Sequence, residues 1–396
     1  WIAVHKVSVD VLLQLLSHSE FGKQLQKEKR PEILVLIKYF LGIKSSPADK
    51  DEREKGSDLF SIAINSVRGR AFETLVVFAQ NDGDKLETET KHLFEDVLKD
   101  SSLAVRFLVG HYLATFYFRD KDYIKKLLPS IFSKDSLESK DAYLAVWEGY
   151  LSNTLYSQLF DVLGEYYKFA IKQNSANYTD RKYFKDLDEA LAVHIALAFA
   201  HLNLQIGDPL FELFWKTANQ KRHHEFISFI GRSCLTRGDA GDEWLKKNNV
   251  DKKKLIKFWD WALENVLDPK ILSAFGYWVN PNKEVLDDKA VLERISKTLE
   301  ISNGDIEWEY GLMGRLLKFA EIDPEIVLTI IRIYLLGAND DLNPLRDPWG
   351  LHVDQIKVVL AVICKVDGYR QKVEKLIDIL IDRGSNRFWT LKDVLR

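Results

Sequence analysis

The sequence predicts an all-α protein, an irregular α-solenoid of stacked antiparallel helix hairpins. Three observations carry this prediction. Apolar residues recur at spacings of three and four along most of the chain, as at Leu103, Phe107, His111 and Ala114. The turns between apolar stretches are short and polar, which suits antiparallel neighbours. The 396 residues contain only 20 glycines and 9 prolines, fewer than a sandwich or barrel would need.

The N-terminal part, 1–43, is predicted to form helices that include Val9–Leu16 and Pro31–Leu41. Proline suits the first turn of a helix, where its missing N–H costs nothing. Because the apolar pattern is already under way at Trp1, we expect these helices to continue from a missing upstream region. The segment 44–58 is charged and almost free of large apolar residues, so it is predicted to be an exposed polar linker or loop.

The region 59–205 is predicted to hold regular helix hairpins. The expected pairs are Ser61–Gln80 with Glu87–Lys99, Leu103–Arg119 with Asp122–Phe132, and Leu137–Leu151 with Leu155–Gln173, followed by Asp188–Gln205. One such pair cannot bury its apolar face alone, so neighbouring pairs must stack and share a core.

The region 206–396 is predicted to continue as less regular helical repeats. Helices should begin at the Asp-Pro pairs at 208–209, 268–269 and 323–324, because aspartate is a good N-cap and proline fits the first helical position. A final hairpin is expected from Val353–Val366 and Tyr369–Arg383.

An apolar ladder containing one arginine occurs twice. "INSVRGRAFETLVVFA" at 64–79 is followed by "LAVRFLVGHYLATFYF" at 103–118, with an aspartate ahead of the second copy in "DSSLAVR". This pattern resembles the HEAT repeat, and the resemblance makes 59–205 a HEAT-like region. It implies that Arg68 and Arg106 are ladder arginines and that Asp100 is an acidic partner. The first copy departs from the pattern, because Ile62 stands where an aspartate is expected.

A second resemblance concerns function. The phrase "INSVRGRAFETL" and aromatic-rich hairpins such as "AVWEGYLSNTLYSQLFDVLGEYYKFAI" resemble the C-terminal helical regions of bacterial anti-phage defence proteins of the STAND NTPase or SIR2-linked type. In that group an upstream effector and nucleotide-binding module precede a helical sensor that binds a phage protein. The resemblance therefore implies a sensor region with a phage-encoded protein partner.

Composition restricts the class of partner. The net charge of −3 argues against general binding of nucleic acid, and no apolar run reaches the length of a membrane span. The basic clusters at 119–126 and 246–257 contain acids and are typical of ordinary helix surface. Cys234 and Cys364 form no disulfide framework, which fits the cytoplasm.

The chain contains no familiar catalytic motif. GxxxxGK[ST], GxGxxG, HExxH, GxSxG and CxxC are all missing from the sequence, so we expect no catalytic residue and no cofactor in this region. His194 and His201 lie on one side of a predicted helix and are either metal ligands or buried polar residues. "KRHHE" at 221–225 is either a phosphate contact or a solvated helix face.

The long segment "GANDDLNPLRDPWGLH" at 337–352 has no helical period. Loops of this length are often functional, which makes Asn343, Leu345, Arg346 and Trp349 candidate partner-binding residues. The alternative is a loop that caps the last hairpins.

These observations predict a macromolecule-binding region that is not itself an enzyme, with a catalytic module and an oligomerisation surface expected upstream. The specific hypothesis is the sensor part of a bacterial anti-phage defence protein that binds a protein partner. One alternative is a stand-alone scaffold or adaptor. Another is an enzyme with an unfamiliar helical site near His194 and His201.

Overall fold

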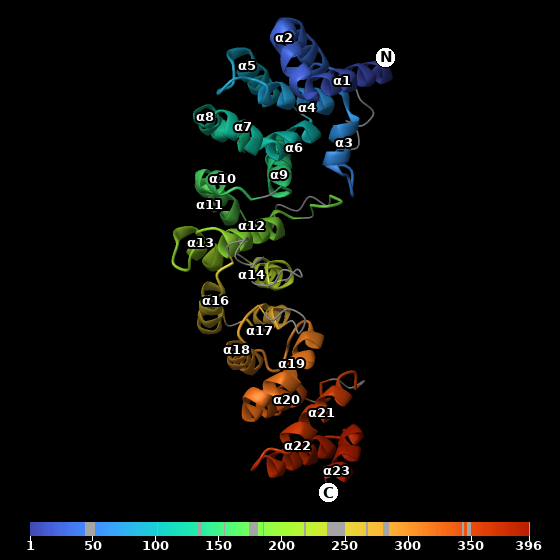
Figure 1. The fold of residues 1–396 in the computed structure, drawn as a ribbon, viewed down its shortest axis with the longest axis vertical. Coiled ribbons are helices and arrows are strands. Elements are labelled where there is room, and N and C mark those ends of the chain that lie inside the picture. Colours follow the sequence, from blue (N-terminus) through green and yellow to red (C-terminus); the bar gives the residue numbers. More distant parts are fainter. Residues whose placement is uncertain are drawn as a thin grey trace. The chain divides into compact units, whose positions relative to one another are not determined.

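The computed structural model of the chain is all-helical (Figure 1). It describes residues 1–43, 52–100, 102–133, 137–153, 155–173, 181–184, 186–217, 219–235, 250–266, 268–279, 285–342, 344–346 and 350–395. No β-strand occurs in this part of the chain, which confirms the predicted all-α class. None of the helices described has the length and apolar character needed to cross a membrane.

The chain divides into two compact units, 1–194 and 195–396. Unit 1 contains α1 Ile2–Ser17, α2 Ser19–Leu41, α3 Leu59–Asn65, α4 Val67–Gln80, α5 Thr88–Val97, α6 Leu103–His111, α7 Leu113–Arg119, α8 Lys121–Ile131, α9 Leu137–Leu151, α10 Ser157–Val162, α11 Gly164–Lys172 and the first half of α12 Leu187–His201. Helices α1, α2 and α4 pack together, α3 and α4 pack on α6, and α6 packs on α9.

Unit 2 contains the rest of α12 and a second series of helices. These are α13 Pro209–Thr217, α14 Gln220–Phe229, a π-helical turn Ile230–Cys234, α16 Lys252–Asn265, α17 Pro269–Leu272, a 3₁₀ segment Ser273–Trp278, α18 Asp288–Ile301, α19 Glu309–Ile322, α20 Pro324–Leu336, α21 Val353–Ile363, α22 Arg370–Asp382, a 3₁₀ turn Asn386–Phe388 and α23 Trp389–Leu395. Helices α16, α18 and α20 pack in succession, as do α19, α21 and α22.

The Asp-Pro starts are confirmed, since α13, α17 and α20 each begin at the proline. At α20 the Asp323 carboxylate accepts hydrogen bonds from the backbone N–H groups of Glu325 at 3.0 Å and Ile326 at 3.1 Å. The side chain thus satisfies two of the donors that a helix leaves unpaired at its N-terminus.

Three stretches predicted as single helices are each broken in two. Ser66 is extended (φ −98°, ψ 152°) between α3 and α4, and its hydroxyl accepts from the Gly69 N–H at 2.9 Å. Tyr112 separates α6 from α7, and Leu163 separates α10 from α11. The apolar pattern runs unbroken across each position, so periodicity alone could not locate the breaks.

Within the linker or loop predicted over 44–58, residues 53–56 are exposed, whereas Glu52 is not. Glu52 is buried, and its carboxylate accepts from the Ser102 hydroxyl at 2.5 Å and from the Leu103 N–H at 2.8 Å. A negative charge is favourable at the N-terminus of α6, where the helix dipole is positive and backbone donors are unpaired. The other residues of the predicted linker, 44–51, lie outside the described part of the chain.

Helices α6 and α9 cross at two glycines, Gly110 and Gly149. A methyl group at Gly110 would overlap the carbonyl oxygen of Val146 on α9, and one at Gly149 would overlap the carbonyl oxygen of Phe107 on α6. Only a residue without a side chain allows the two backbones to approach this closely. The crossing fixes the neighbouring residues of both helices, which form one side of the pocket described next.

Candidate functional site

Unit 1 contains an open pocket of about 940 Å³ between α3, α6, α9, residues 182–184 and the start of α12. This volume is typical of a ligand-binding cleft. The residues that line it are Asp58, Phe60, Phe107, His111, Glu148, Leu151, Ser152, Lys182, Tyr183, Phe184, Asp186, Glu189, Ala190 and Val193.

An aromatic cluster forms one wall of the pocket. The Phe60 ring from α3 lies 6.1 Å from the Phe107 ring and 5.5 Å from the His111 ring, both on α6. Phe107 is buried, whereas 41% of Phe60 is exposed and offers apolar surface to a ligand. Burial lowers the pKa of His111, so this wall carries no charge at neutral pH.

The polar wall of the pocket is rich in carboxylates. Asp58 accepts from the Ser61 N–H at 3.0 Å and caps α3, while Asp186 accepts from the Glu189 N–H at 2.8 Å at the start of α12. Glu148 and Glu189 bring the number of acidic lining residues to four. Lys182 is the only lysine or arginine among the described lining residues, so the pocket is predominantly negative.

A buried ion pair supports this wall. Glu148 on α9 lies 2.8 Å from the Arg181 guanidinium, and both side chains are buried. Burial raises the pKa of Glu148 to about 8, with the Asp58 carboxylate adding to the shift and Arg181 opposing it. Arg181 also donates to the Glu52 carbonyl at 2.8 Å. This bond connects residues 181–184, of which 182–184 line the pocket, to the segment 52–58. The pair therefore positions the rim of the pocket.

The three residues of the predicted arginine ladder lie outside the pocket. The Arg68 guanidinium donates to Asp100 at 2.8 Å and ties α4 to the turn before α6. Arg106 instead donates to the Leu98 carbonyl at 2.6 Å. Burial lowers the pKa of Arg106, while the nearby Asp100 opposes that shift. Two arginines in similar sequence contexts thus have different kinds of partner.

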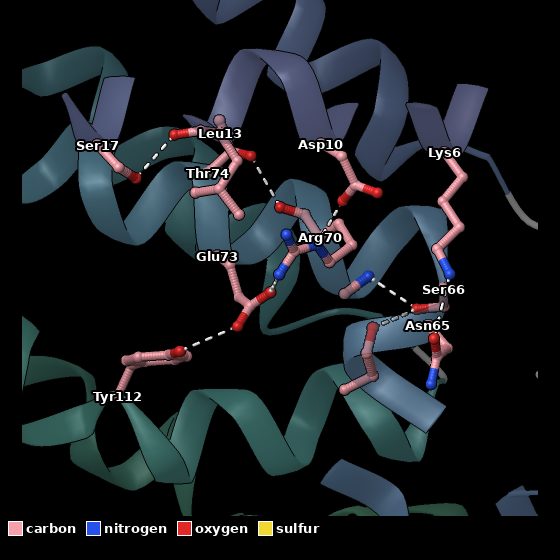
Figure 2. A network of polar contacts seen from close by, with 12 residues as sticks. Lys6, Asp10, Leu13, Ser17, Asn65, Ser66, Arg70, Glu73, Thr74 and Tyr112 are labelled. Atoms are coloured by element: carbon pink, nitrogen blue, oxygen red, sulfur yellow. Dashed lines mark hydrogen bonds and ion pairs between the residues drawn. The ribbon is translucent and has the colours of Figure 1, made fainter. Parts of the chain in front are cut away.

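Arg70, two positions after Arg68, was not predicted from the sequence to have a structural role. Figure 2 shows it between Asp10 of α1 and Glu73 of α4, each bonded at 2.6 Å. Glu73 also accepts from the Tyr112 hydroxyl at 3.1 Å. The second arginine of "VRGR" could have suggested a further ion pair, but no residue near the motif in sequence indicates that its partner is Asp10 of α1.

The predicted loop site is only partly described. Asn343 and Trp349 lie outside the described residues. Leu345 and Arg346 line a small pocket in unit 2, and Arg346 donates to Asp305 at 3.0 Å and to the Asn303 carbonyl at 3.2 Å. Arg346 therefore holds this segment against the turn that follows α18.

The histidines do not form a metal centre in the described part of the chain, which contains no cluster of three or more ligand-type side chains. His194 is buried beside the Tyr167 hydroxyl at 2.8 Å, and burial lowers its pKa to about 4. In "KRHHE", His223 stacks on Trp215 with ring centres 4.3 Å apart, and His224 lies 2.5 Å from Glu307. These contacts are those of structural residues.

The start of unit 1 carries an exposed apolar surface. Val4, Val7, Val11 and Leu15 recur at three and four along α1 and are exposed. Further exposed apolar residues on or beside α1 and α2 are Trp1, Ile2, Phe21, Val35, Leu36 and Tyr39. Exposed apolar patches on soluble proteins are often interaction sites, and the spacing of Val4, Val7, Val11 and Leu15 places these four residues on one side of α1.

The chain matches no protein-family model, and neither a curated protein nor a solved structure shows significant similarity to it. Inferences about function therefore come from the residues and their arrangement.

Proposed function

We propose that this chain is a protein-binding helical region, built as an irregular HEAT-like α-solenoid, and that the pocket of unit 1 receives a segment of its partner. The solenoid is supported by the order of packing within each unit, where the principal contacts join helices close to one another along the chain. Arrays of this type present broad surfaces and act by binding.

The observation that carries the proposal is the composition of the pocket. An apolar wall that includes Phe60 and Phe107 shares the pocket with four acidic residues and a single lysine, and the raised pKa of Glu148 leaves the negative charge to the other three acids. A complementary partner segment has an apolar side chain to cover the aromatic wall and a lysine or arginine to meet the carboxylates.

Binding, rather than catalysis, is supported by the polar groups of the pocket. Asp58 and Asp186 cap helices, and Glu148 is paired with Arg181. A general acid or base must be able to exchange a proton with a substrate, whereas these carboxylates already have structural partners.

The identity of the partner follows from the sequence resemblance alone. We propose that the chain is the target-recognition part of a larger bacterial anti-phage defence protein and binds a phage-encoded protein in the cytosol. The "INSVRGRAFETL" phrase and the aromatic-rich hairpins carry this proposal.

The test compares co-purification from phage-infected and uninfected cells, with the bound proteins identified by mass spectrometry. Glu189→Lys reverses one exposed charge in the pocket, and Glu89→Lys is the matched control because both glutamates lie in the first turn of a helix. We expect a phage protein that is retained by wild type and Glu89→Lys and lost with Glu189→Lys.

Equal retention by both variants would exclude the pocket as the docking site. A partner captured equally well from uninfected cells, and still dependent on Glu189, would favour the scaffold or adaptor.

A further inference from the structure

Unit 2 contains a second, smaller pocket of about 190 Å³ with a different chemistry. The buried side chains of Leu335, Val353 and Phe388 contribute apolar surface to it. Its other lining residues are Pro344, Leu345, Arg346, Arg383, Gly384, Ser385, Asn386 and Arg387. Three arginines thus line a pocket that has no acidic residue among its described lining residues.

The arginines come from two segments, Arg346 from the stretch before α21 and Arg383 and Arg387 from the stretch that follows α22. Arg346 is fixed by its bonds to Asp305 and the Asn303 carbonyl. Arg383, at the end of α22, donates from one nitrogen to the Asp340 backbone carbonyl at 2.7 Å. This bond uses a neutral acceptor, so the positive charge of Arg383 is not compensated by it.

Arg387 is the third and most informative arginine. It is exposed, and it makes no hydrogen bond or ion pair in the part of the chain that the structure describes. Its guanidinium packs directly on Gly350, whose φ of +69° is readily adopted by glycine, and a methyl group there would overlap the guanidinium. Gly350 therefore leaves room for the Arg387 guanidinium, which has no acidic partner among the described residues.

Two acids that contact the segments of this pocket are already engaged elsewhere. Asp305 binds Arg346, and the Asp340 carboxylate binds Arg332 at 3.0 Å and 2.5 Å. Neither neutralises Arg383 or Arg387. The described lining residues of the pocket therefore carry an excess of positive charge beside the apolar side chains of Leu335, Val353 and Phe388.

We propose that this pocket binds a phosphoryl group. A carboxylate has two oxygens and is satisfied by one arginine fork, whereas a phosphoryl group presents three oxygens and up to two negative charges. Three guanidinium groups that line one pocket suit the three oxygens of a phosphoryl group, and the pocket is large enough for one such group. The phosphoryl group belongs either to a free phosphate ion or to a phosphorylated side chain of a protein partner.

The test is isothermal titration calorimetry of the full chain at constant ionic strength. The titrants are inorganic phosphate, the peptide acetyl-Gly-phosphoserine-Gly-amide, and acetate as the carboxylate control. We expect saturable binding of at least one phosphorylated titrant and none of acetate. Arg387→Gln should weaken that binding by about tenfold or more, the value of one charge-assisted contact.

Arg370→Gln is the matched control, because Arg370 is exposed on α22 and paired with Glu374 outside the pocket. It should bind as wild type does, and the circular dichroism spectra of both variants should be unchanged. Tighter binding of the peptide than of inorganic phosphate assigns the site to a phosphorylated protein, and the reverse order assigns it to the free ion. The proposal fails if no phosphorylated titrant saturates, if acetate binds equally well, or if Arg387→Gln binds as wild type does.

Discussion

Helix α6 is held in unit 1 by two contacts of different physical kinds. At its N-terminal end, the Arg68–Asp100 ion pair ties α4 to the turn that leads into the helix. Near its C-terminal end, Gly110 crosses Gly149 of α9 with backbone against backbone. The first contact is electrostatic and tolerates small movements, whereas the second is steric and tolerates almost none.

The difference matters for the pocket. Phe107 and His111 flank Gly110 on α6, and Glu148 precedes Gly149 on α9. The glycine crossing therefore sets the distance between the aromatic wall and the carboxylate wall. The ion pair, by contrast, contributes stability without reaching the pocket.

The largest expected effect comes from breaking the glycine crossing. Gly110→Ala forces α6 and α9 apart, because the new methyl group meets a backbone carbonyl that cannot rotate away. We expect the free energy of unfolding to fall by about 3 kcal/mol, in spite of the higher helix propensity of alanine. Urea denaturation followed by circular dichroism measures this change.

Gly164→Ala is the matched control, since no atom beyond its chain neighbours and the adjacent backbone of its own helix lies within 4 Å of the position that a methyl group would take. It should leave stability unchanged or raise it slightly. Equal effects of the two substitutions would show that the crossing is not tight.

Removing the ion pair should have the next largest effect. Arg68→Met leaves Asp100 without its guanidinium partner at a site where only 15% of the aspartate side chain is exposed. We expect a loss of about 2 kcal/mol, less than for a fully buried pair because water can reach part of the carboxylate. The double variant Arg68→Met, Asp100→Asn should recover part of this loss, and strict additivity in the double-mutant cycle would argue against direct coupling.

Of these two contacts, the residues of the ion pair could be identified from the sequence and those of the glycine crossing could not. The repeated Val-Arg and the aspartate in "DSSLAVR" drew attention to Arg68 and Asp100 through their resemblance to the HEAT repeat. Gly110 and Gly149 gave no such signal, since an isolated glycine in a helical pattern only predicts weaker helix. A close crossing depends on which backbone lies opposite, and local sequence does not contain that information.

The pocket of unit 1 could not be predicted from the sequence for a related reason. Glu52 lies in a stretch whose composition predicts exposure, yet it is buried as a cap on α6. Glu148 and Arg181 are far apart in sequence and carry no motif. In the predicted loop site, Arg346 was predicted from the lack of a helical period. Arg383 and Arg387, which line the same pocket, follow α21 and α22 in the sequence, so no local pattern joins them to Arg346.

The pH dependence of stability provides a further test of the glycine crossing, because Glu148 lies directly before Gly149. Glu148 has a pKa of about 8 in the folded state against 4.5 for an ordinary glutamate. Between these values the folded state keeps a proton that the unfolded state has lost, so stability falls as the pH rises from about 5 to 8. The slope should be at most about 1.4 kcal/mol per pH unit.

Denaturation at a series of pH values measures this slope. Glu148→Gln should remove the contribution, because glutamine does not titrate. Gly149→Ala should reduce it, because separated helices admit water to Glu148. An unchanged slope in Glu148→Gln would assign the pH dependence to another group.

The smallest effect is expected at Arg106, the second arginine of the repeated ladder. Its bond is to the neutral Leu98 carbonyl, so Arg106→Met removes one charge-assisted hydrogen bond and leaves no acid without its principal partner. We expect a loss of about 1 kcal/mol, half that of Arg68→Met. Parallel urea titrations of the two variants test the ranking. A loss at Arg106 equal to that at Arg68 would mean that both arginines act on Asp100, as a repeating ladder requires, and that the two copies of the motif are physically equivalent.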